Sequence, residues 1–257
     1  MLKIDRRQRI TEHLQTHGSM RVSEAVSLLS VSAATVRRDF ALLSEDGLAE
    51  RGHGGIAAGP RLRLKGWMPP YQWRRMVQVA EKRRIAKAAS QLLSPGDAVF
   101  IDGGTTTLHL ASFLPAGLRV ITNSVILASA LDEVSSSDRS LEVYIAGGFI
   151  YPRSGLLVGP QAVETIGRYH ARWAFLSVGG VSVEGVTNNV EQVVDVEQAM
   201  IRNAEKVVLL ADHTKIGNKA LVRMCGLDEV DMVITDQEAP GEALEAIRSA
   251  GVACEVV

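Results

Sequence analysis

The chain of 257 residues is 46% hydrophobic and 22% charged, proportions that are typical of a globular protein. No apolar run reaches the roughly 18 residues of a membrane-spanning helix, and the charged N-terminus lacks the apolar stretch of a signal peptide. These features predict a cytoplasmic protein with no membrane segment and no metal site, and free thiols at the two cysteines, Cys225 and Cys254.

Charge is unevenly distributed along the chain, although the formal net charge is only -1. Residues 1–87 carry 17 lysines and arginines against 8 aspartates and glutamates, whereas residues 88–257 carry 11 against 21. A basic N-terminal part on an acidic body favours a polyanion such as double-stranded DNA as the partner of the N-terminal part alone. A basic face that is merely solvated is the alternative that composition leaves open.

The first 47 residues contain three short helical patterns separated by tight breaks. Helices are expected within residues 6–17, 22–30 and 32–46. In the third pattern Val36, Phe40 and Leu43 fall on one face, which we expect to point inward. The opposite face carries Ala34, Arg38 and Ala41, with Thr35 and Arg37 on its flanks. A helix with small residues and two arginines there suits entry into a major groove and contact with bases and phosphates. The predicted DNA-binding residues are Ser32, which is also a good N-cap, and Ala34, Thr35, Arg37 and Arg38.

The next stretch, GLAERGHGGI at residues 47–56, is short enough for a two-stranded wing whose glycines permit a tight turn. Arg51 and His53 lie on this wing, where they serve either in phosphate contacts or in the structure of the turn. The pattern predicts a winged helix-turn-helix DNA-binding domain over residues 1–58. Residues 59–80, with the helix-breaking pair Pro69–Pro70, are expected to form a linker.

Strands and helices are predicted to alternate from residue 81 to residue 257. The strands are expected at residues 98–102, 118–123, 141–148, 172–180, 206–212, 230–236 and 252–257. The helices are expected at residues 81–93, 107–114, 124–131, 161–169, 195–204 and 241–251. Short apolar runs between helices are typical of a parallel sheet covered on both faces, so the predicted fold class is α/β, with a Rossmann-like parallel-sheet domain over residues 81–257.

Five of the predicted strands are followed by glycines or polar residues. Because parallel strands end at one edge of the sheet, we expect these loops to form a single pocket. Glycines let backbone N–H groups approach an anion, a lysine neutralises it, and Asp102, Asn123 and Asp212 suit hydroxyl groups. This inventory fits a phosphorylated sugar or polyol, and the lack of any nucleotide-binding fingerprint predicts no cofactor. The predicted effector-binding residues are Asp102, Gly103, Gly104, Thr105, Thr106, Thr107, Asn123, Ser124, Gly179, Gly180, Asp212 and Lys215; a pure turn role is the alternative for each glycine.

Motifs in both parts of the chain carry a family resemblance. They are VSAATVRRDF at 31–40 and RGHGG at 51–55, then EKRRIA at 81–86, DGGTTT at 102–107, ADHTK at 211–215 and VITD at 233–236. With these motifs the chain resembles the DeoR family of bacterial transcription regulators. The resemblance implies a C-terminal domain similar to ribose-5-phosphate isomerase, a phosphorylated sugar-type effector, and repression of a carbohydrate or polyol operon. Arg153 also fits the family pattern, and it either reaches the phosphate or is an ordinary surface arginine.

The main alternative is a sugar-phosphate isomerase-like enzyme fused to a DNA-binding domain, with Asp102, Asp212 and Lys215 in catalytic roles. A binding pocket needs the same residues, and a basic DNA-binding domain has no use in an isomerase, so we predict a regulator and not an enzyme. A third alternative is a structural body that needs no ligand. One small DNA-binding domain makes too few contacts for an operator, so a homo-oligomer, either a dimer or a tetramer, is expected.

Overall fold

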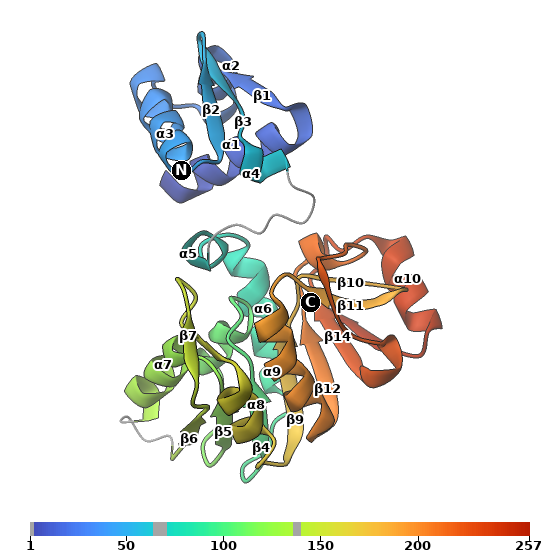
Figure 1. Ribbon diagram of the computed structural model, residues 1–257. Helices are drawn as coiled ribbons and strands as arrows, with labels where there is room; N and C mark the ends of the chain where they lie inside the picture. Colours follow the sequence, from blue (N-terminus) through green and yellow to red (C-terminus); the bar gives the residue numbers. More distant parts are fainter. Residues whose placement is uncertain (1–2, 64–70, 136–139) are drawn as a thin grey trace. The chain divides into compact units, whose positions relative to one another are not determined.

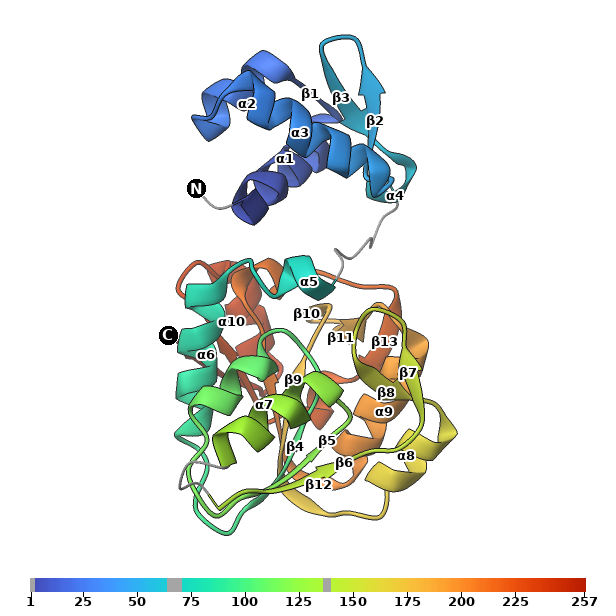
Figure 2. The ribbon, with the colours of Figure 1, turned by 90° about the vertical axis from the view of Figure 1, so that its left-hand side faces the viewer.

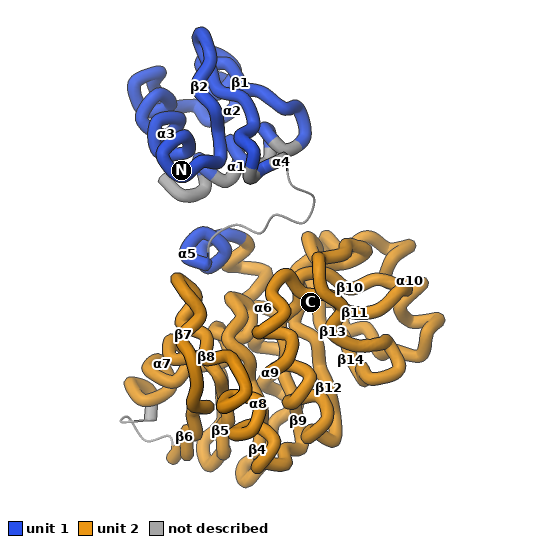
Figure 3. The backbone as a smooth tube through the Cα atoms, viewed as in Figure 1, with its two compact units in different colours: residues 1–77 blue, residues 78–257 orange. Residues whose placement is uncertain are grey.

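The computed structural model describes residues 3–63, 71–135 and 140–257 (Figure 1). The chain divides into two compact units, residues 1–77 and residues 78–257 (Figure 3). The first unit takes in most of the predicted linker, where short helices α4 (Pro60–Arg63) and α5 (Tyr71–Arg74) form. The predicted break at Pro69–Pro70 lies outside the described residues, and the domain boundaries at residues 58 and 80 stay predictions.

Besides α4 and α5, the described part of the first unit contains three longer helices and a small antiparallel sheet. The helices are α1 (Lys3–His17), α2 (Val22–Leu29) and α3 (Ala33–Glu45), in agreement with the three predicted patterns. The strands β1 (Ser19–Arg21), β2 (Ala49–Gly52) and β3 (Gly55–Ala58) pair in the order β1-β3-β2. Strand β1 was not predicted, because three residues between two helices carry no periodic signal. Ile10, Leu14, Phe40 and Leu43 are buried in one core, so the inward face of α3 is confirmed.

The second unit is built on seven parallel strands in the order β15-β14-β12-β9-β4-β5-β6. Figure 1 shows the strands from β14 to β6 in this order, and Figure 2 shows helices on both sides of the sheet. The strands are β4 (Ala98–Ile101), β5 (Arg119–Thr122), β6 (Glu142–Ile145), β9 (Ala171–Ser177), β12 (Ala204–Leu210), β14 (Met232–Thr235) and β15 (Ala253–Val256). Each lies within a predicted strand or within two residues of its bounds. The predicted α/β class with a parallel sheet is therefore confirmed.

Helices cover both faces of this sheet. On one face α6 (Val79–Ser90) and α7 (Val125–Ser135) pack on side chains such as Val99 and Ile101. On the other face α8 (Pro160–Ile166) and α9 (Glu191–Arg202) share a hydrophobic core with Phe100 and Ala174, and α10 (Gly241–Ser249) adds Leu244 and Ile247 to this core. Successive residues of β4 thus point to opposite layers, as strand geometry requires. The described part of the chain contains no helix that could cross a membrane.

Two parts of the second unit differ from the prediction. Residues 107–114, expected as an α-helix, form the 3-10 helix η1 (Thr107–Ser112), with bonds such as His109 N–H to the Thr106 carbonyl at 3.1 Å. Short antiparallel strands also appear outside the main sheet. They are the hairpin β7 (Phe149–Tyr151) with β8 (Leu156–Val158), and β10 (Gly180–Ser182) with β11 (Gly185–Asn188) and β13 (Val222–Cys225). Strands of three or four residues are too short for a period-two pattern.

Both cysteines are free thiols, as predicted. Cys225 is buried at the end of β13, and burial raises the pKa of its thiol to about 12. This thiol therefore remains protonated at neutral pH and acts as a small apolar side chain.

Candidate functional site

Helix α3 presents its predicted DNA-binding residues away from the core of the first unit. Ser32 caps the helix, and its hydroxyl accepts a hydrogen bond from the Thr35 backbone N–H at 3.3 Å. Arg37 and Arg38 are exposed, and Ala34 is exposed one turn earlier. The side chains on this face are therefore free of the packing that holds the opposite face, as a recognition helix requires.

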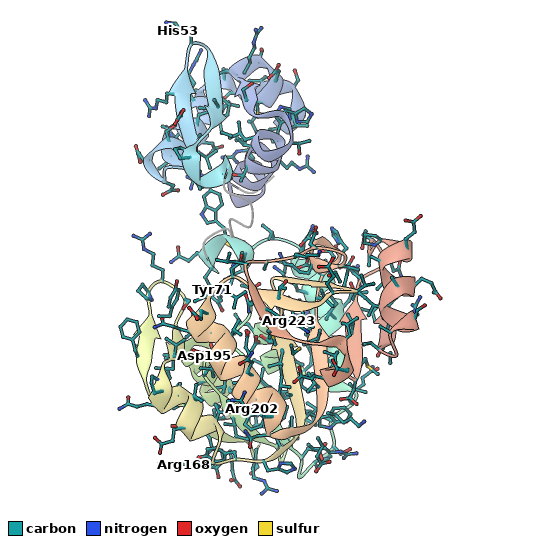
Figure 4. The ribbon with its side chains drawn as sticks, turned by 45° about the vertical axis from the view of Figure 1, so that its right-hand side comes forward. His53, Tyr71, Arg168, Asp195, Arg202 and Arg223 are labelled. Atoms are coloured by element: carbon teal, nitrogen blue, oxygen red, sulfur yellow. The ribbon has the colours of Figure 1, made fainter. Side chains whose placement is uncertain are left out.

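The wing is the β2–β3 hairpin, with Arg51 on β2 and His53 in its turn. His53 is exposed and stands at the tip of the hairpin (Figure 4). Gly54 has a φ of +76°, and a Cβ on Gly55 would lie 2.4 Å from the Met20 carbonyl oxygen. The glycines thus form the turn and let β3 approach β1, while Arg51 and His53 remain exposed.

A buried ion pair holds α3 against α1, and sequence reasoning missed it. Asp39 is only 1% exposed, and its carboxylate lies 2.8 Å from Arg6 Nε and 3.5 Å from Arg7 Nε. Asp39 directly follows Arg37 and Arg38 in the sequence. Its partners are 33 and 32 positions away, so no local pattern could reveal the pairing.

The loops that were predicted to carry the effector site do follow neighbouring strands. Strands β12, β9, β4, β5 and β6 are adjacent in the sheet and all parallel. Their carboxyl ends therefore lie side by side at one edge, where α/β proteins bind ligands. This arrangement brings together the loops that begin at residues 102, 123, 147, 178 and 211.

Asp102 is the central polar residue of this edge. It is 2% exposed, and one carboxylate oxygen accepts hydrogen bonds from the Gly104 N–H at 3.1 Å and the Thr107 hydroxyl at 2.7 Å. The other oxygen accepts from the Ser177 N–H at 2.9 Å and the Ser177 hydroxyl at 2.7 Å. Four protein donors already use this carboxylate, so its first role is to hold the 103–107 loop against the end of β9. A contact with an effector hydroxyl stays a prediction.

Gly103 and Gly104 are required by packing. A Cβ on Gly103 would lie 1.9 Å from Leu156 Cδ2, and one on Gly104 would lie 2.0 Å from Ser177 Oγ. Thr105 and Thr106 follow and are each 5% exposed. The loop therefore packs closely against β9 and the β7–β8 hairpin. A 3-10 helix of six residues follows this loop.

Asn123 and Ser124 end β5 beside this loop. The Asn123 amide nitrogen donates to the Leu157 carbonyl at 3.3 Å, and its amide oxygen is buried without a hydrogen-bond partner. A buried acceptor without a partner is unusual and suits a ligand hydroxyl. The Ser124 hydroxyl accepts from the Leu127 N–H at 3.1 Å and so caps α7. Ser124 therefore has a structural role in addition to its place at the edge.

Glu197 on α9 adds a second buried carboxyl group to the site. It is 1% exposed, and both of its oxygens accept hydrogen bonds from the Asn188 amide, at 2.8 and 3.1 Å. Burial, and then the charge of Asp102, hold the pKa of Glu197 well above its ordinary value of 4.5. Sequence reasoning missed this residue, because a glutamate on an amphipathic helix is usually exposed. An Asn188–Glu197–Asp102 cluster thus joins β11, α9 and the end of β4.

The loop after β12 holds Asp212 and Lys215. Asp212 is buried, and its carboxylate accepts hydrogen bonds from the N–H and the hydroxyl of Thr214, which makes it the cap of the 3-10 helix η2 (His213–Lys215). Lys215 is half-buried at the end of η2. The loop is thus built to hold the lysine at the edge of the sheet.

His213 and Asp236 form a pair beside Lys215. His213 Nδ1 lies 2.8 Å from Asp236 Oδ1, and the His213 backbone N–H donates to Asp236 Oδ2 at 2.8 Å. Burial alone would raise the pKa of Asp236, but hydrogen bonds from Glu238 and His213 outweigh it and lower the pKa. Donor atoms of His213, Asp236 and Glu238 lie within 4.8 Å of one another, as in a metal site. The ring and the carboxylate already bind each other, so we assign no metal there.

The remaining predicted residues lie farther out along the edge. A Cβ on Gly179 would lie 2.7 Å from Ala220 Cβ, and one on Gly180 would lie 2.3 Å from the Asn218 carbonyl oxygen. Both glycines are therefore needed for the loop after Lys215 to pack. Arg153 is exposed in the β7–β8 turn, with a φ of +62° that arginine rarely adopts. A contact between Arg153 and a phosphate stays a prediction.

Comparison with known proteins identifies the family. The sequence pattern of the DeoR-like helix-turn-helix domain matches residues 6–59, and that of the DeoR C terminal sensor domain matches residues 77–237. The chain belongs to the DeoR family. The DeoR-family protein named HTH-type transcriptional regulator GlpR, from Haloferax volcanii, is 34% identical over 98% of this chain and 97% of its own length. The glycerol-3-phosphate regulon repressor of Escherichia coli K12 is 30% identical over 96% of each chain.

The family assignment makes this chain a DNA-binding transcription regulator with a sensor domain, as predicted. Among solved structures, ribose 5-phosphate isomerase A from Methanocaldococcus jannaschii matches 52% of each chain at 15% identity, with a TM-score of 0.35. That likeness is too low to support a conclusion about this chain. The assignment of the two units to the DeoR family rests on the matched domains, and the architecture of the second unit rests on its seven parallel strands.

Proposed function

We propose that this DeoR-family protein represses a carbohydrate or polyol operon and leaves its operator when a phosphorylated sugar or polyol binds at the carboxyl edge of the parallel sheet. The observation that carries the proposal is the convergence of five loops at that edge. One of these loops holds Lys215, and another leaves the Asn123 amide oxygen buried without a hydrogen-bond partner. A cation for the phosphate and an acceptor for a hydroxyl suit one small phosphorylated ligand.

Release from DNA requires that the effector bind one arrangement of the protein more tightly than the other. A change from mostly bound to mostly free, from 99:1 to 1:99, needs a preference on the order of 10⁴-fold. We infer that effector binding at the sheet edge shifts the linker and misaligns paired DNA-binding domains. The predicted homo-oligomer is part of this proposal, with half-sites about 10–10.5 base pairs apart or a multiple of that spacing. Sedimentation of the complex between the protein and a duplex with two such half-sites measures how many protein chains bind each duplex.

The proposed site differs from that of an isomerase in one respect. Isomerisation needs a carboxylate that is free to take a proton from carbon. The Asp102 carboxylate already accepts four hydrogen bonds, and that of Asp212 caps η2. These bonds favour a binding site without catalysis. Turnover of pentose or hexose phosphates by the purified protein would contradict this part of the proposal.

The test begins with a duplex that the purified protein selects from a random DNA pool. Glycerol 3-phosphate, glucose 6-phosphate and related phosphates are then compared with their unphosphorylated counterparts by thermal shift. A compound at 100 times its Kd is expected to stabilise the folded protein by about 2.7 kcal/mol. Each compound that stabilises is added to the protein–DNA complex, and release of DNA is expected. If no compound of the panel stabilises the protein, the alternative of a C-terminal domain with a purely structural role and no ligand would be favoured.

A further inference from the structure

Helix α6 connects the linker to the effector edge of the sheet. The helix (Val79–Ser90) leads directly into β4, so it runs antiparallel to the strands and begins at their carboxyl edge. The residue that precedes the helix, the N-cap Gln78, is also the first residue of the second unit. The chain therefore enters this unit at the same edge where the proposed effector site lies. A shift of the loops at that edge can reach the linker over a short path.

The contact at this junction is made by Gln78 and His213. Gln78 Nε2 lies 3.3 Å from His213 Nε2, and the two residues are 135 positions apart in the chain. On the other side of the ring, His213 Nδ1 lies 2.8 Å from Asp236 Oδ1. A ring that donates from Nδ1 to the carboxylate can accept at Nε2 from the Gln78 amide. One imidazole thus joins the first residue of the second unit to the end of β14.

The two ends of this contact are held in place by different means. Asp236 is fully buried, so the carboxylate fixes the orientation of the ring. His213 opens η2, the three-residue helix that ends at Lys215, so the ring and the proposed phosphate-binding lysine move as one piece. Gln78 has a φ of +51°, a left-handed conformation that is uncommon for glutamine. Such a conformation persists only where the surrounding contacts maintain it.

We propose that His213 is a positioning residue that couples the effector site to the linker: a ligand that moves η2 moves the imidazole, which releases or shifts Gln78 and the start of α6. The proposal rests on the proposed function, because it assumes that the ligand binds beside Lys215. It assigns to His213 no contact with the ligand. Arg84, which lies 3.8 Å from Glu238, provides a second and more exposed link between α6 and the loop after β14.

The test compares the wild-type protein with Gln78→Ala and His213→Gln. The coupling factor is the ratio of the DNA Kd with and without glycerol 3-phosphate or glucose 6-phosphate, whichever stabilises the protein. Allosteric coupling factors of about 5–150-fold are typical, and in both variants we expect the factor to fall toward 1. The Kd for the ligand without DNA, and the Kd for DNA without ligand, should change less than about twofold. The double variant should lose no more coupling than either single variant, because one contact is removed in both.

His170→Gln is the matched control. His170 is an exposed histidine that lies 3.5 Å from Glu205, and it directly precedes β9, at the opposite edge of the sheet. The control should retain the full coupling factor. Full coupling in Gln78→Ala would overturn the proposal. A parallel loss of ligand affinity in His213→Gln would also overturn it, because His213 would then belong to the binding site.

A second measurement separates this proposal from the proposed function. If no phosphorylated compound stabilises the wild-type protein, it is the proposed function that fails. Hydrogen exchange of the ligand-free protein then tests separately whether the contact between Gln78 and His213 holds the start of α6. The Lys82 amide, which donates to the Gln78 carbonyl at 2.9 Å, should exchange faster in His213→Gln than in the wild type or in His170→Gln. Equal exchange in the three proteins would show that His213 does not hold the start of α6.

Discussion

Arg37 and Arg38 illustrate what a single residue contributes to the function of the first unit. Both are exposed on α3: Arg38 lies opposite the buried Val36 and Phe40, and Arg37 lies on the flank of that exposed face. Arginine donates two parallel hydrogen bonds to guanine in the major groove, and it also binds phosphate. The two modes differ in their consequence, since only a base contact carries sequence preference.

We expect Arg37→Ala or Arg38→Ala to weaken binding to the selected duplex by about 1–3 kcal/mol if the lost contact is to a base. The preference at that base should then relax in a repeated selection. A phosphate contact would instead weaken binding to all sequences and reduce its salt dependence. Arg202→Ala, at an exposed position on α9, is the control (Figure 4). Unchanged affinity and sequence preference in both α3 variants would contradict the assignment of this helix.

Glu197 provides a prediction about pH. The pKa of Glu197 is raised in the folded protein, so its contribution to stability is fully present below its ordinary pKa of 4.5 and is lost as the pH rises toward the folded value. Glu197→Gln keeps an acceptor for Asn188 and removes the ionisable group. The free energy of unfolding of the wild type, relative to this variant, should fall by up to about 1.4 kcal/mol per pH unit above pH 5. Urea unfolding at pH 5, 6, 7 and 8 measures the difference, and parallel pH profiles would contradict it.

At the scale of the element, the 103–107 loop depends on the absence of a side chain at Gly104. A Cβ there would lie 2.0 Å from Ser177 Oγ and 2.2 Å from Ser177 Cβ, so Gly104→Ala should push the loop away from β9. Overpacking of this kind costs about 1–3 kcal/mol of stability. Gly241→Ala, where no atom lies within 4 Å, is the matched control and should change stability little. Thermal unfolding of the two variants tests this, and equal stabilities would show that the loop is not tightly packed.

Elements differ in how far the sequence could predict them. The strands of the parallel sheet are apolar runs such as VVLL within β12, which are bounded by turn residues and are readable locally. The run TLHLAS fits a 3-10 helix as well as an α-helix, because six residues do not distinguish a period of 3.0 from one of 3.6. Ser177, one of the hydrogen-bond partners of Asp102, is 75 residues away in sequence, and Asn188, the partner of Glu197, is 9 residues away. The polar residues at the carboxyl edge of the sheet were therefore predictable from the sequence, but the hydrogen bonds that their side chains make were not.

At the scale of the whole molecule, the charge asymmetry and the two matched domains both indicate that the N-terminal part binds DNA and the C-terminal part binds the ligand. The 17 basic residues within residues 1–87 include the exposed arginines of α3, which suit DNA, whereas the acidic second unit concentrates its candidate ligand groups at one sheet edge. A repressor needs the second unit to influence the first, and linkage makes this influence reciprocal. A ligand that weakens DNA binding must itself bind less tightly when DNA is present.

Lys215 allows the proposed phosphate site, and through it the influence of the second unit on DNA binding, to be tested. Lys215→Ala should leave the Kd for DNA unchanged, because residue 215 lies in the second unit, and should abolish release by phosphorylated compounds. Loss of a charged hydrogen bond to phosphate costs about 1.5–3 kcal/mol, which is roughly a 10- to 150-fold weaker ligand affinity. Lys219→Ala is the matched control, because Lys219 is an exposed lysine whose ion pair with Glu184 contributes little. DNA release by Lys215→Ala at the ligand concentration that releases the wild type would mean that the phosphate binds elsewhere.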